Sequence, residues 1–208
     1  MAGAKLPIEV SVKGVAAFAW LYKKDEKFAK KPEDAKFKLT LIVDKDEIDD
    51  LPARLDNGET VVSGKEWLTH IQEMHDQAGG DEEPQNCPVK DGDKQLDKKG
   101  KQKKETNKEL EGKYAINFST KWPVQMVDTK KNDLPEAVKI MSGDIVKVSY
   151  RPFQYEGGVT LRMATVMLIE KRAGGGGTAA FGDDEEGYVV EQTESAAAIT
   201  GDDTNGDY

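Results

Sequence analysis

Cationic and aromatic side chains at alternating positions are the residues of this sequence best suited to chemistry. Lysines and arginines recur on the polar faces of segments whose apolar residues alternate. A stripe of such cations suits a phosphate backbone, because neutralising phosphates releases counterions. Aromatic rings beside the cations would let bases stack, each stack contributing about 1–3 kcal/mol. The predicted DNA-binding residues are Trp20, Tyr22, Lys36, Lys38, Lys113, Lys121, Trp122, Lys147, Arg151, Phe153, Tyr155 and Arg162.

The aromatic residues of this set differ in how well they fit a stacking role. Trp122 lies between Lys121 and Pro123 at a predicted strand end, which makes it the best stacking candidate. Trp20 fits a core position equally well. Three other aromatics alternate with apolar residues and are predicted to be core, namely Tyr114, Phe118 and Tyr150. The cationic stripe itself has an alternative reading as an ordinary solvated sheet face.

The histidines and the cysteine do not form a recognisable metal motif. A zinc-binding helix needs two histidines four residues apart with a neighbouring glutamate, whereas His70 and His75 are five apart. Cys87 is the single cysteine. We therefore expect both histidines on a helix surface, and neither a metal nor a cofactor. Converging carboxylates are not visible in a sequence, so a metal-dependent nuclease or other nucleic-acid enzyme stays open as the alternative.

The net charge of −9 comes from the last 36 residues. Residues 173–208 hold nine of the 39 acids and no lysine or arginine, which leaves 30 acids and 30 bases in residues 1–172. An uneven charge distribution of this kind is typical of an interaction tail. The body is neutral overall and is free to carry a basic face.

Four glycines at 174–177 predict a hinge, and the acidic sequence after them predicts a disordered tail. The tail should reach about 30–35 Å. A body of this size has a radius of gyration of about 15 Å. The tail can therefore reach the body's own basic groove and compete with DNA. The residues expected to bind partners are Asp183, Asp184, Glu185, Glu186, Tyr188, Asp207 and Tyr208.

The predicted interface requires β-strands to position it. Residues 10–22 are apolar and β-prone, and residues 37–43 alternate with Phe37, Leu39, Leu41 and Val43 on one face. Further strands are predicted at 113–121, 145–150 and 159–171, with a hairpin at 154–158. In the last strand, one face is expected to comprise Val159, Leu161, Met163, Thr165, Met167 and Ile169. Val166 and Leu168 lie on the other face with Arg162, so this end of the strand is expected to be covered on both faces.

Residues 45–112 read as a helical and loop insertion in this strand pattern. A helix capped by Ser63 or Gly64 places Trp67, Leu68, Ile71 and Met74 near helical spacing. An earlier helical turn is expected around 46–55, and residues 78–112 are expected to form a long mobile loop.

The strand pattern predicts a mainly β fold, an OB-type five-stranded barrel with a helical insertion, over residues 1–172. The helix of an OB barrel normally lies between strands three and four, whereas here it follows the second recognisable strand. A β-sandwich is the alternative. No signal peptide and no apolar stretch of 18 residues is visible, and a single cysteine fits a reducing cytoplasm.

Several segments together resemble the OB-fold single-stranded-DNA-binding proteins of tailed bacteriophages. They are residues 14–22, the strand at 36–43, residues 114–121, and the C-terminal run of Ser142-Gly143-Asp144, "VTLRMATVMLIEK", "GGGG" and "FGDDEEGY". The chain departs from the pattern in about twenty residues after "DDEEGY" and in ending on Tyr208.

The resemblance implies a non-catalytic protein that coats and protects single-stranded DNA in phage replication, recombination and repair. It also implies a homodimer in the host cytoplasm whose acidic tail contacts the replicative polymerase and helicase-primase. A different class of function is an adaptor protein with an acidic tail that binds no DNA.

Overall fold

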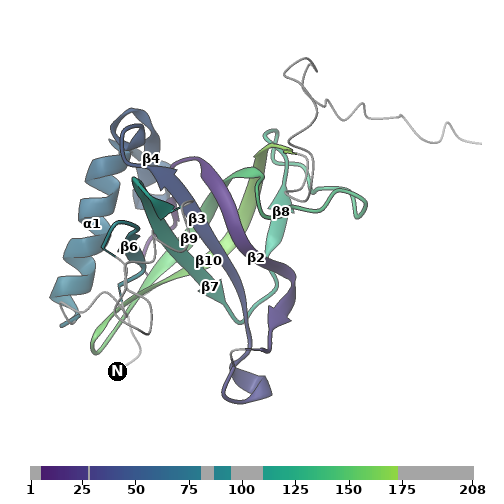
Figure 1. Ribbon diagram of the computed structural model, residues 1–208, viewed down its shortest axis with the longest axis horizontal. Helices are drawn as coiled ribbons and strands as arrows, with labels where there is room; N and C mark the ends of the chain where they lie inside the picture. Colours follow the sequence, from purple (N-terminus) through teal and green to yellow (C-terminus); the bar gives the residue numbers. More distant parts are fainter. Residues whose placement is uncertain (1–5, 28, 81–86, 95–109, 173–208) are drawn as a thin grey trace, which may run out of the picture.

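A closed β-barrel forms the centre of the molecule (Figure 1). The structure, a computed structural model, describes residues 6–27, 29–80, 87–94 and 110–172. The strands pair in the order β2-β3-β7-β10-β9, and β9 pairs back with β2. Strands β7 and β10 run parallel, and the other neighbours in the ring are antiparallel. The barrel strands are β2 (Gly14–Asp25), β3 (Lys36–Asp44), β7 (Lys113–Thr120), β9 (Ile145–Tyr155) and β10 (Gly158–Glu170).

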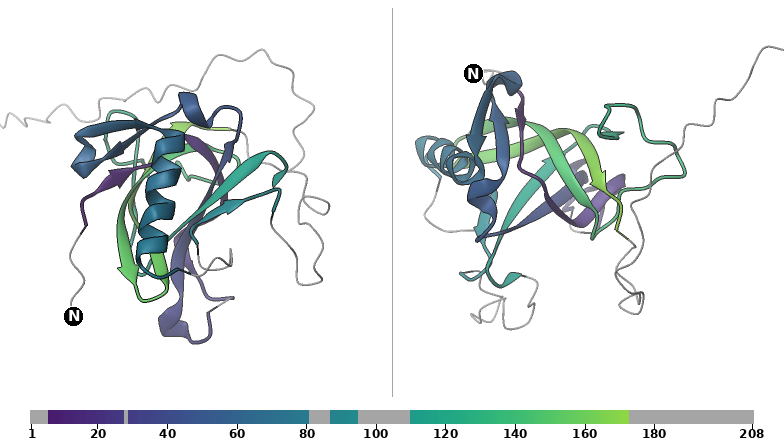
Figure 2. Two further views of the ribbon diagram at one scale, coloured as in Figure 1. Left: turned by 90° about the vertical axis from the view of Figure 1, so that its left-hand side faces the viewer. Right: turned by 90° about the horizontal axis from the view of Figure 1, so that it is seen from above.

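The predicted five-stranded barrel is thus confirmed, and the helix does follow the second barrel strand. Helix α1 (Gly64–Gln77) connects β3 to β7 and lies against one side of the barrel (Figures 1 and 2). It begins at a capping box in which Ser63 and Glu66 bond each other's backbone N–H groups. Trp67 and Ile71 are fully buried beneath it. Gly64 is required because a Cβ there would lie 2.3 Å from the carbonyl oxygen of Ile48.

A short sheet extends the barrel beyond β9, in the order β9-β1-β4-β5. It comprises β1 (Glu9–Val10), β4 (Pro52–Leu55) and β5 (Thr60–Ser63). The helical turn expected at 46–55 is therefore only partly right, because helical structure is confined to η2 (Ile48–Asp50). The turn η3 (Asp56–Gly58) connects β4 to β5, which pair antiparallel. Asn57 and Gly58 adopt positive φ in this turn.

The remaining elements are short. Strand β6 (Val89–Asp91) pairs with β7, and β8 (Gln125–Val127) pairs with β10. Helix η1 (Pro32–Asp34) precedes β3. The loop expected at 78–112 therefore contains one strand, and its segments 81–86 and 95–109 lie outside the described residues, as does the tail at 173–208. No helix in the described part is long and apolar enough to cross a bilayer.

The barrel interior is filled by the inward side chains of its strands. Leu39, Leu41, Phe118 and Tyr150 are each at most 1% exposed, as the alternation predicted. The expected face of the last strand is wrong beyond Met163. A β-bulge between Met163 and Thr165 changes the alternation, so Val166 points inward and is fully buried.

A chain of hydrogen bonds links α1 to the barrel. The Trp67 indole N–H donates to Tyr150 Oη at 2.6 Å, and Tyr150 Oη donates to the Glu9 carboxylate at 2.6 Å. The other Glu9 oxygen lies 3.0 Å from His70 Nε2. Burial, and then the Glu9 carboxylate, raises the pKa of Tyr150 well above 10, so the hydroxyl stays protonated. These bonds fix α1, β1 and β9 relative to one another.

Candidate nucleic-acid interface

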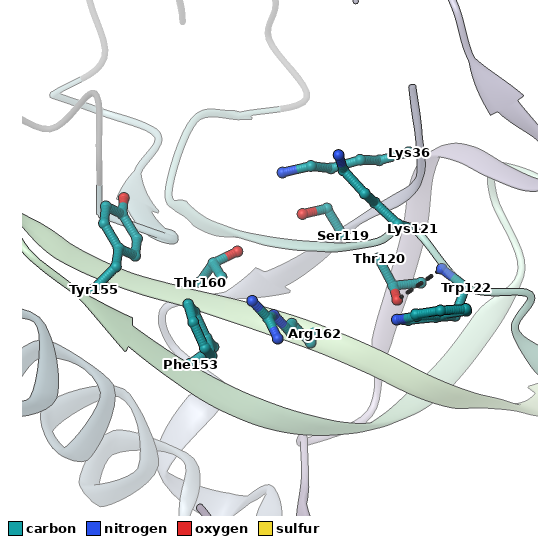
Figure 3. Close-up of a pocket in the computed structure, with 9 residues that line it drawn as sticks. All are labelled: Lys36, Ser119, Thr120, Lys121, Trp122, Phe153, Tyr155, Thr160 and Arg162. Carbon is teal, nitrogen blue, oxygen red and sulfur yellow. Dashed lines mark hydrogen bonds between the residues drawn. The ribbon is translucent and has the colours of Figure 1, made fainter. Parts of the chain in front are cut away.

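A groove of about 390 Å³ lies on the outer surface where β3 begins, β7 ends and the β9–β10 hairpin turns (Figure 3). We call it the Trp122 groove. Its lining combines three cations, three aromatic rings and three hydroxyl side chains. The lining residues are Lys36, Ser119, Thr120, Lys121, Trp122, Phe153, Tyr155, Thr160 and Arg162.

The end of β7 presents the indole of Trp122 to solvent. Thr120 is the last strand residue, and its Oγ1 accepts a bond from the Trp122 backbone N–H at 3.3 Å. Pro123 follows and cannot donate to a further ladder bond, so the strand stops here. Trp122 is 77% exposed. An exposed indole beside a lysine is suited to stacking on a base.

Phe153 and Arg162 stack in the middle of the same groove. The guanidinium carbon of Arg162 lies 3.4 Å from the centroid of the Phe153 ring. Figure 3 shows this pair with Tyr155 on the side of the hairpin turn and Trp122 on the other. Lys36 and Lys121 add two ammonium groups. The Lys121 ammonium lies 3.5 Å from the Asp34 carboxylate. Because both side chains are exposed, this ion pair stabilises the fold little, and DNA phosphates can displace Asp34 from Lys121.

A second groove of about 370 Å³ adjoins the first, and Ser119 lines both. We call it the Trp20 groove. Its base is the outer face of β3 and β7, where Thr40 donates to Asn117 Oδ1 at 2.8 Å. Lys38 lies opposite both Trp20 and Ser119 in the strand register. The remaining lining residues are Phe18, Asp25, Leu39 and Phe118.

Charge in the Trp20 groove is locally balanced. The Lys38 ammonium lies 2.8 Å from the carboxylate of Asp25, which is only 3% exposed. Phe18 and Trp20 are 65% and 38% exposed. Aromatic surface is therefore the main feature of this groove, whereas unbalanced positive charge is the feature of the Trp122 groove.

The two grooves bring together eight of the twelve predicted DNA-binding residues. Six line the Trp122 groove, and Trp20 and Lys38 line the Trp20 groove. Tyr22 lies elsewhere, with its hydroxyl accepting from the Ile140 backbone N–H at 2.6 Å. Lys113 lies 3.6 Å from the Asp44 carboxylate at the other end of β7.

The last two predicted cations, Lys147 and Arg151, lie on β9 outside both grooves. Lys147 is half-buried, and its ammonium lies 3.5 Å from the carbonyl oxygen of Pro52. Arg151 is exposed, donates to the carbonyl oxygen of Leu6 at 3.2 Å, and lies opposite Arg162 in the register.

Sequence reasoning missed Phe18 as a groove residue. The signal was present, because Phe18, Trp20 and Tyr22 occupy alternate positions of one strand and so predict an aromatic face. It also missed the uncharged polar residues that separate the cations. These are Thr40, Asn117, Ser119, Thr120 and Thr160.

The histidines do not lie where the sequence placed them. His70 contacts Glu9, but His75 is fully buried beneath the end of α1, close to Gly80 and Gly158, so the expected surface position of His75 is wrong. Gly80 and Gly158 leave the space that its ring fills. Within the described ranges, no three His, Cys, Asp or Glu side chains come together as a metal site.

Residues 12–195 match the family described as the single-stranded-DNA-binding protein of Enterobacter phage Enc34. The chain belongs to this Enc34 family. The Enc34 family is one of non-enzymatic phage single-stranded-DNA-binding proteins, which confirms the resemblance seen in the sequence. No protein among curated sequences matches the chain.

Solved structures of phage proteins share the fold. The Enc34 protein in complex with single-stranded DNA is 17% identical, with a TM-score of 0.59 over 81% of this chain and 89% of that one. A C-terminal truncation of the Enc34 protein is 16% identical, with a TM-score of 0.59 over 84% and 99%. The bacteriophage T7 protein gp2.5, a single-stranded DNA binding protein, is 17% identical, with a TM-score of 0.51 over 88% and 100%.

Proposed function

We propose that this protein binds single-stranded DNA along the Trp122 and Trp20 grooves with little regard to sequence. The observation that carries the proposal is the composition of the Trp122 groove, where the exposed indole and the Phe153–Arg162 stack lie with Lys36 and Lys121. Rings stack on any base, and cations bind the backbone common to all sequences. The Enc34 protein, a member of the same family, has been solved with single-stranded DNA.

Each groove would contribute differently to binding. The Trp122 groove supplies phosphate contacts from its three cations and stacking from its three rings. The Trp20 groove supplies mainly stacking, because its Lys38 is already paired with Asp25. The hydroxyl and amide groups between them can bond sugar or base edges without selecting one sequence.

Titration of the wild-type protein with oligodeoxythymidylate tests this proposal. Of the three tryptophans, Trp122 and Trp20 are exposed in the grooves and Trp67 is fully buried. DNA should therefore quench part of the tryptophan fluorescence, and the affinity should fall steeply as salt rises. Absence of quenching, or an affinity that ignores salt, would refute the proposal. Duplex of the same length, titrated in parallel, measures the preference for single strands.

The same proposal assigns the protein a place in phage DNA metabolism. It would coat and protect single strands during replication, recombination and repair, as a homodimer in the host cytoplasm. The acidic tail would recruit the replicative polymerase and helicase-primase. Mass photometry of the free protein, and pull-down of these enzymes with and without the tail, test the two assembly claims separately.

The tail is further proposed to compete with DNA for the grooves. Asp144, which is fully buried, binds the Lys171 ammonium and the Arg172 backbone N–H and so fixes where the tail begins. Truncation after Arg172 removes nine negative charges and should tighten DNA binding, most strongly at low salt. Weaker binding by the truncated chain would rule out the competition.

A further inference from the structure

Three cations gather on the outer surface of the sheet extension, away from both grooves. They are Lys13 between β1 and β2, Arg54 on β4 and Lys147 on β9, and we call them the β9 patch. Val10 of β1 lies opposite Arg54 on one side and Ser149 on the other, so β4 and β9 flank the two-residue strand β1. The Lys147 ammonium lies 3.5 Å from the carbonyl oxygen of Pro52, two residues before Arg54.

The patch concentrates positive charge, although the Arg54 guanidinium donates to the carbonyl oxygen of Gly58 at 3.2 Å. Burial and then the positive charges of Arg54 and Lys13 lower the pKa of Lys147. Within the described part of the chain, none of the three cations lies within 4.0 Å of a carboxylate. Like charges held together destabilise a fold unless an anion joins them. The patch therefore has the character of an anion site.

The outer face of β9 connects this patch to the Trp122 groove. Val146, Val148 and Tyr150 are fully buried, so the alternate residues Lys147, Ser149 and Arg151 face outward. Phe153 continues the row and lines the groove. Lys147 and Arg151 are four residues apart, about 13 Å along the strand.

Strand β10 supports the same path. Arg162 lies opposite Arg151, and Thr165 lies opposite Ser149. The bulge between Met163 and Thr165 is what keeps Thr165 on the outer face beside Ser149. The surface between groove and patch therefore carries two arginines and then two hydroxyls.

We infer that the β9 patch is a second phosphate-binding subsite, which holds the backbone of the same DNA strand after it leaves the Trp122 groove. The inference rests on the proposed function and adds Lys13 and Arg54 to the interface. The patch residues themselves are all cations, so it would bind phosphates and leave bases free. Arg151, Arg162, Ser149 and Thr165 lie between the groove and the patch, which favours one continuous strand over a separate ligand.

The length of the DNA distinguishes the patch from the groove. The double variant Arg54→Gln, Lys147→Gln removes two charges from exposed or half-buried side chains, and urea unfolding checks that it folds. An oligomer of about six nucleotides fills the groove alone, whereas one of about 16 reaches the patch. We expect affinity for the short oligomer to stay within about twofold, and affinity for the long one to fall about tenfold. The salt slope for the long oligomer should decrease by about 1.4, at about 0.7 per phosphate.

Controls separate this inference from the proposed function. The double variant Lys65→Gln, Lys130→Gln removes the same charge from exposed positions elsewhere and should leave both affinities unchanged. Trp122→Ala should weaken both oligomers. If Trp122→Ala changes the affinity for neither the short nor the long oligomer, the proposed function itself is refuted. A failure of the patch variant alone refutes only the second subsite. Arg54→Gln by itself, at an exposed position, repeats the test should the double variant not fold.

Two results would overturn the inference. One is an equal effect, or none, of the patch variant on the short and long oligomers. The other is a loss that disappears when the nine tail acids are replaced by their amides in the full-length chain. That result would show that the patch binds the acidic tail. The variant would then weaken DNA binding only because it frees the tail to compete with DNA for the groove.

Discussion

The guanidinium of Arg162 and the ring of Phe153 stack at 3.4 Å across two neighbouring strands of the barrel. Arg162 lies opposite Arg151 in the register and Phe153 lies opposite Thr160, so the stacked pair is a diagonal one. The stack holds a cation and an aromatic surface in fixed positions before any ligand arrives. A pre-positioned arginine loses less side-chain freedom on binding a phosphate than a free one.

Replacing Arg162 by lysine should separate charge from stacking. Arg162→Lys keeps the positive charge and loses the planar group above Phe153. We expect affinity for single-stranded DNA to fall about two- to fivefold, since an exposed cation–π contact contributes about 0.5–1 kcal/mol. The salt slope should not change. Arg172→Lys, at an exposed position two residues after the end of β10, is the matched control. Wild-type affinity in Arg162→Lys would show that Arg162 acts through charge alone and would contradict a role for the stack.

Phe18 combines exposure with a strained backbone. Its φ is +48°, in the left-handed region that disfavours side chains, and it lies where the β2–β3 register shifts. Strain of this kind is retained where function requires it. Phe18→Gly and Phe18→Ala should weaken DNA binding equally, but the glycine variant should be more stable by about 1 kcal/mol. Urea unfolding and oligomer titration measure the two effects, and equal stability of the variants would contradict the role of strain.

The buried Tyr150 hydroxyl should matter for stability and not for DNA binding. Tyr150→Phe leaves the Trp67 indole N–H and the Glu9 carboxylate each without its 2.6 Å partner. An unsatisfied buried polar group costs about 1–3 kcal/mol, so we expect a loss of at least about 2 kcal/mol in the free energy of unfolding. Tyr155→Phe, on the exposed hairpin, should change it by less than about 0.5 kcal/mol. A comparable loss in both variants would contradict this account.

The alternation of apolar residues was sufficient to predict the barrel strands and their inner faces. Leu39, Leu41 and Phe118 are buried as expected because every barrel strand has one face in the core. The capped helix was equally visible, since Ser63 and Glu66 form a local motif. The bulge in β10 was not visible, because only the pairing with β9 reveals the extra residue.

The candidate site was only partly predictable, for a geometric reason. In a flat sheet all polar faces would share one plane, so the cations of every strand would form one stripe. In a closed barrel the outward faces point in different directions. Position along the strand matters as well: Lys36, Lys121 and Arg162 lie at strand ends that meet in one groove, whereas Lys113 and Lys147 lie near the opposite ends of β7 and β9. Phe18 could have been recognised from its alternation with Trp20 and Tyr22, but its irregular backbone conformation could not.

His70 should give the stability a modest pH dependence. The hydrogen bond with Glu9 raises the pKa of His70 above 6.5, so the folded protein holds this proton more tightly than the unfolded chain. The contribution is complete below about pH 6.5 and is lost as the pH rises through the raised pKa. The loss should be below about 1 kcal/mol, because solvent screens a side chain that is 35% exposed. Urea unfolding between pH 5.5 and 8.5, spanning about the range of a histidine, should show this fall in the wild type and not in His70→Gln.

The most direct test of DNA binding in the groove is titration of Trp122→Ala and wild type with the same oligodeoxythymidylate. Trp122 is 77% exposed and outside the core, so its removal should change the free energy of unfolding by less than about 0.5 kcal/mol. We predict a loss of about 1–3 kcal/mol in binding free energy, about 5- to 150-fold in affinity. Val61→Ala, an exposed apolar residue on β5, should bind like the wild type. Wild-type affinity in Trp122→Ala would contradict the assignment of the groove.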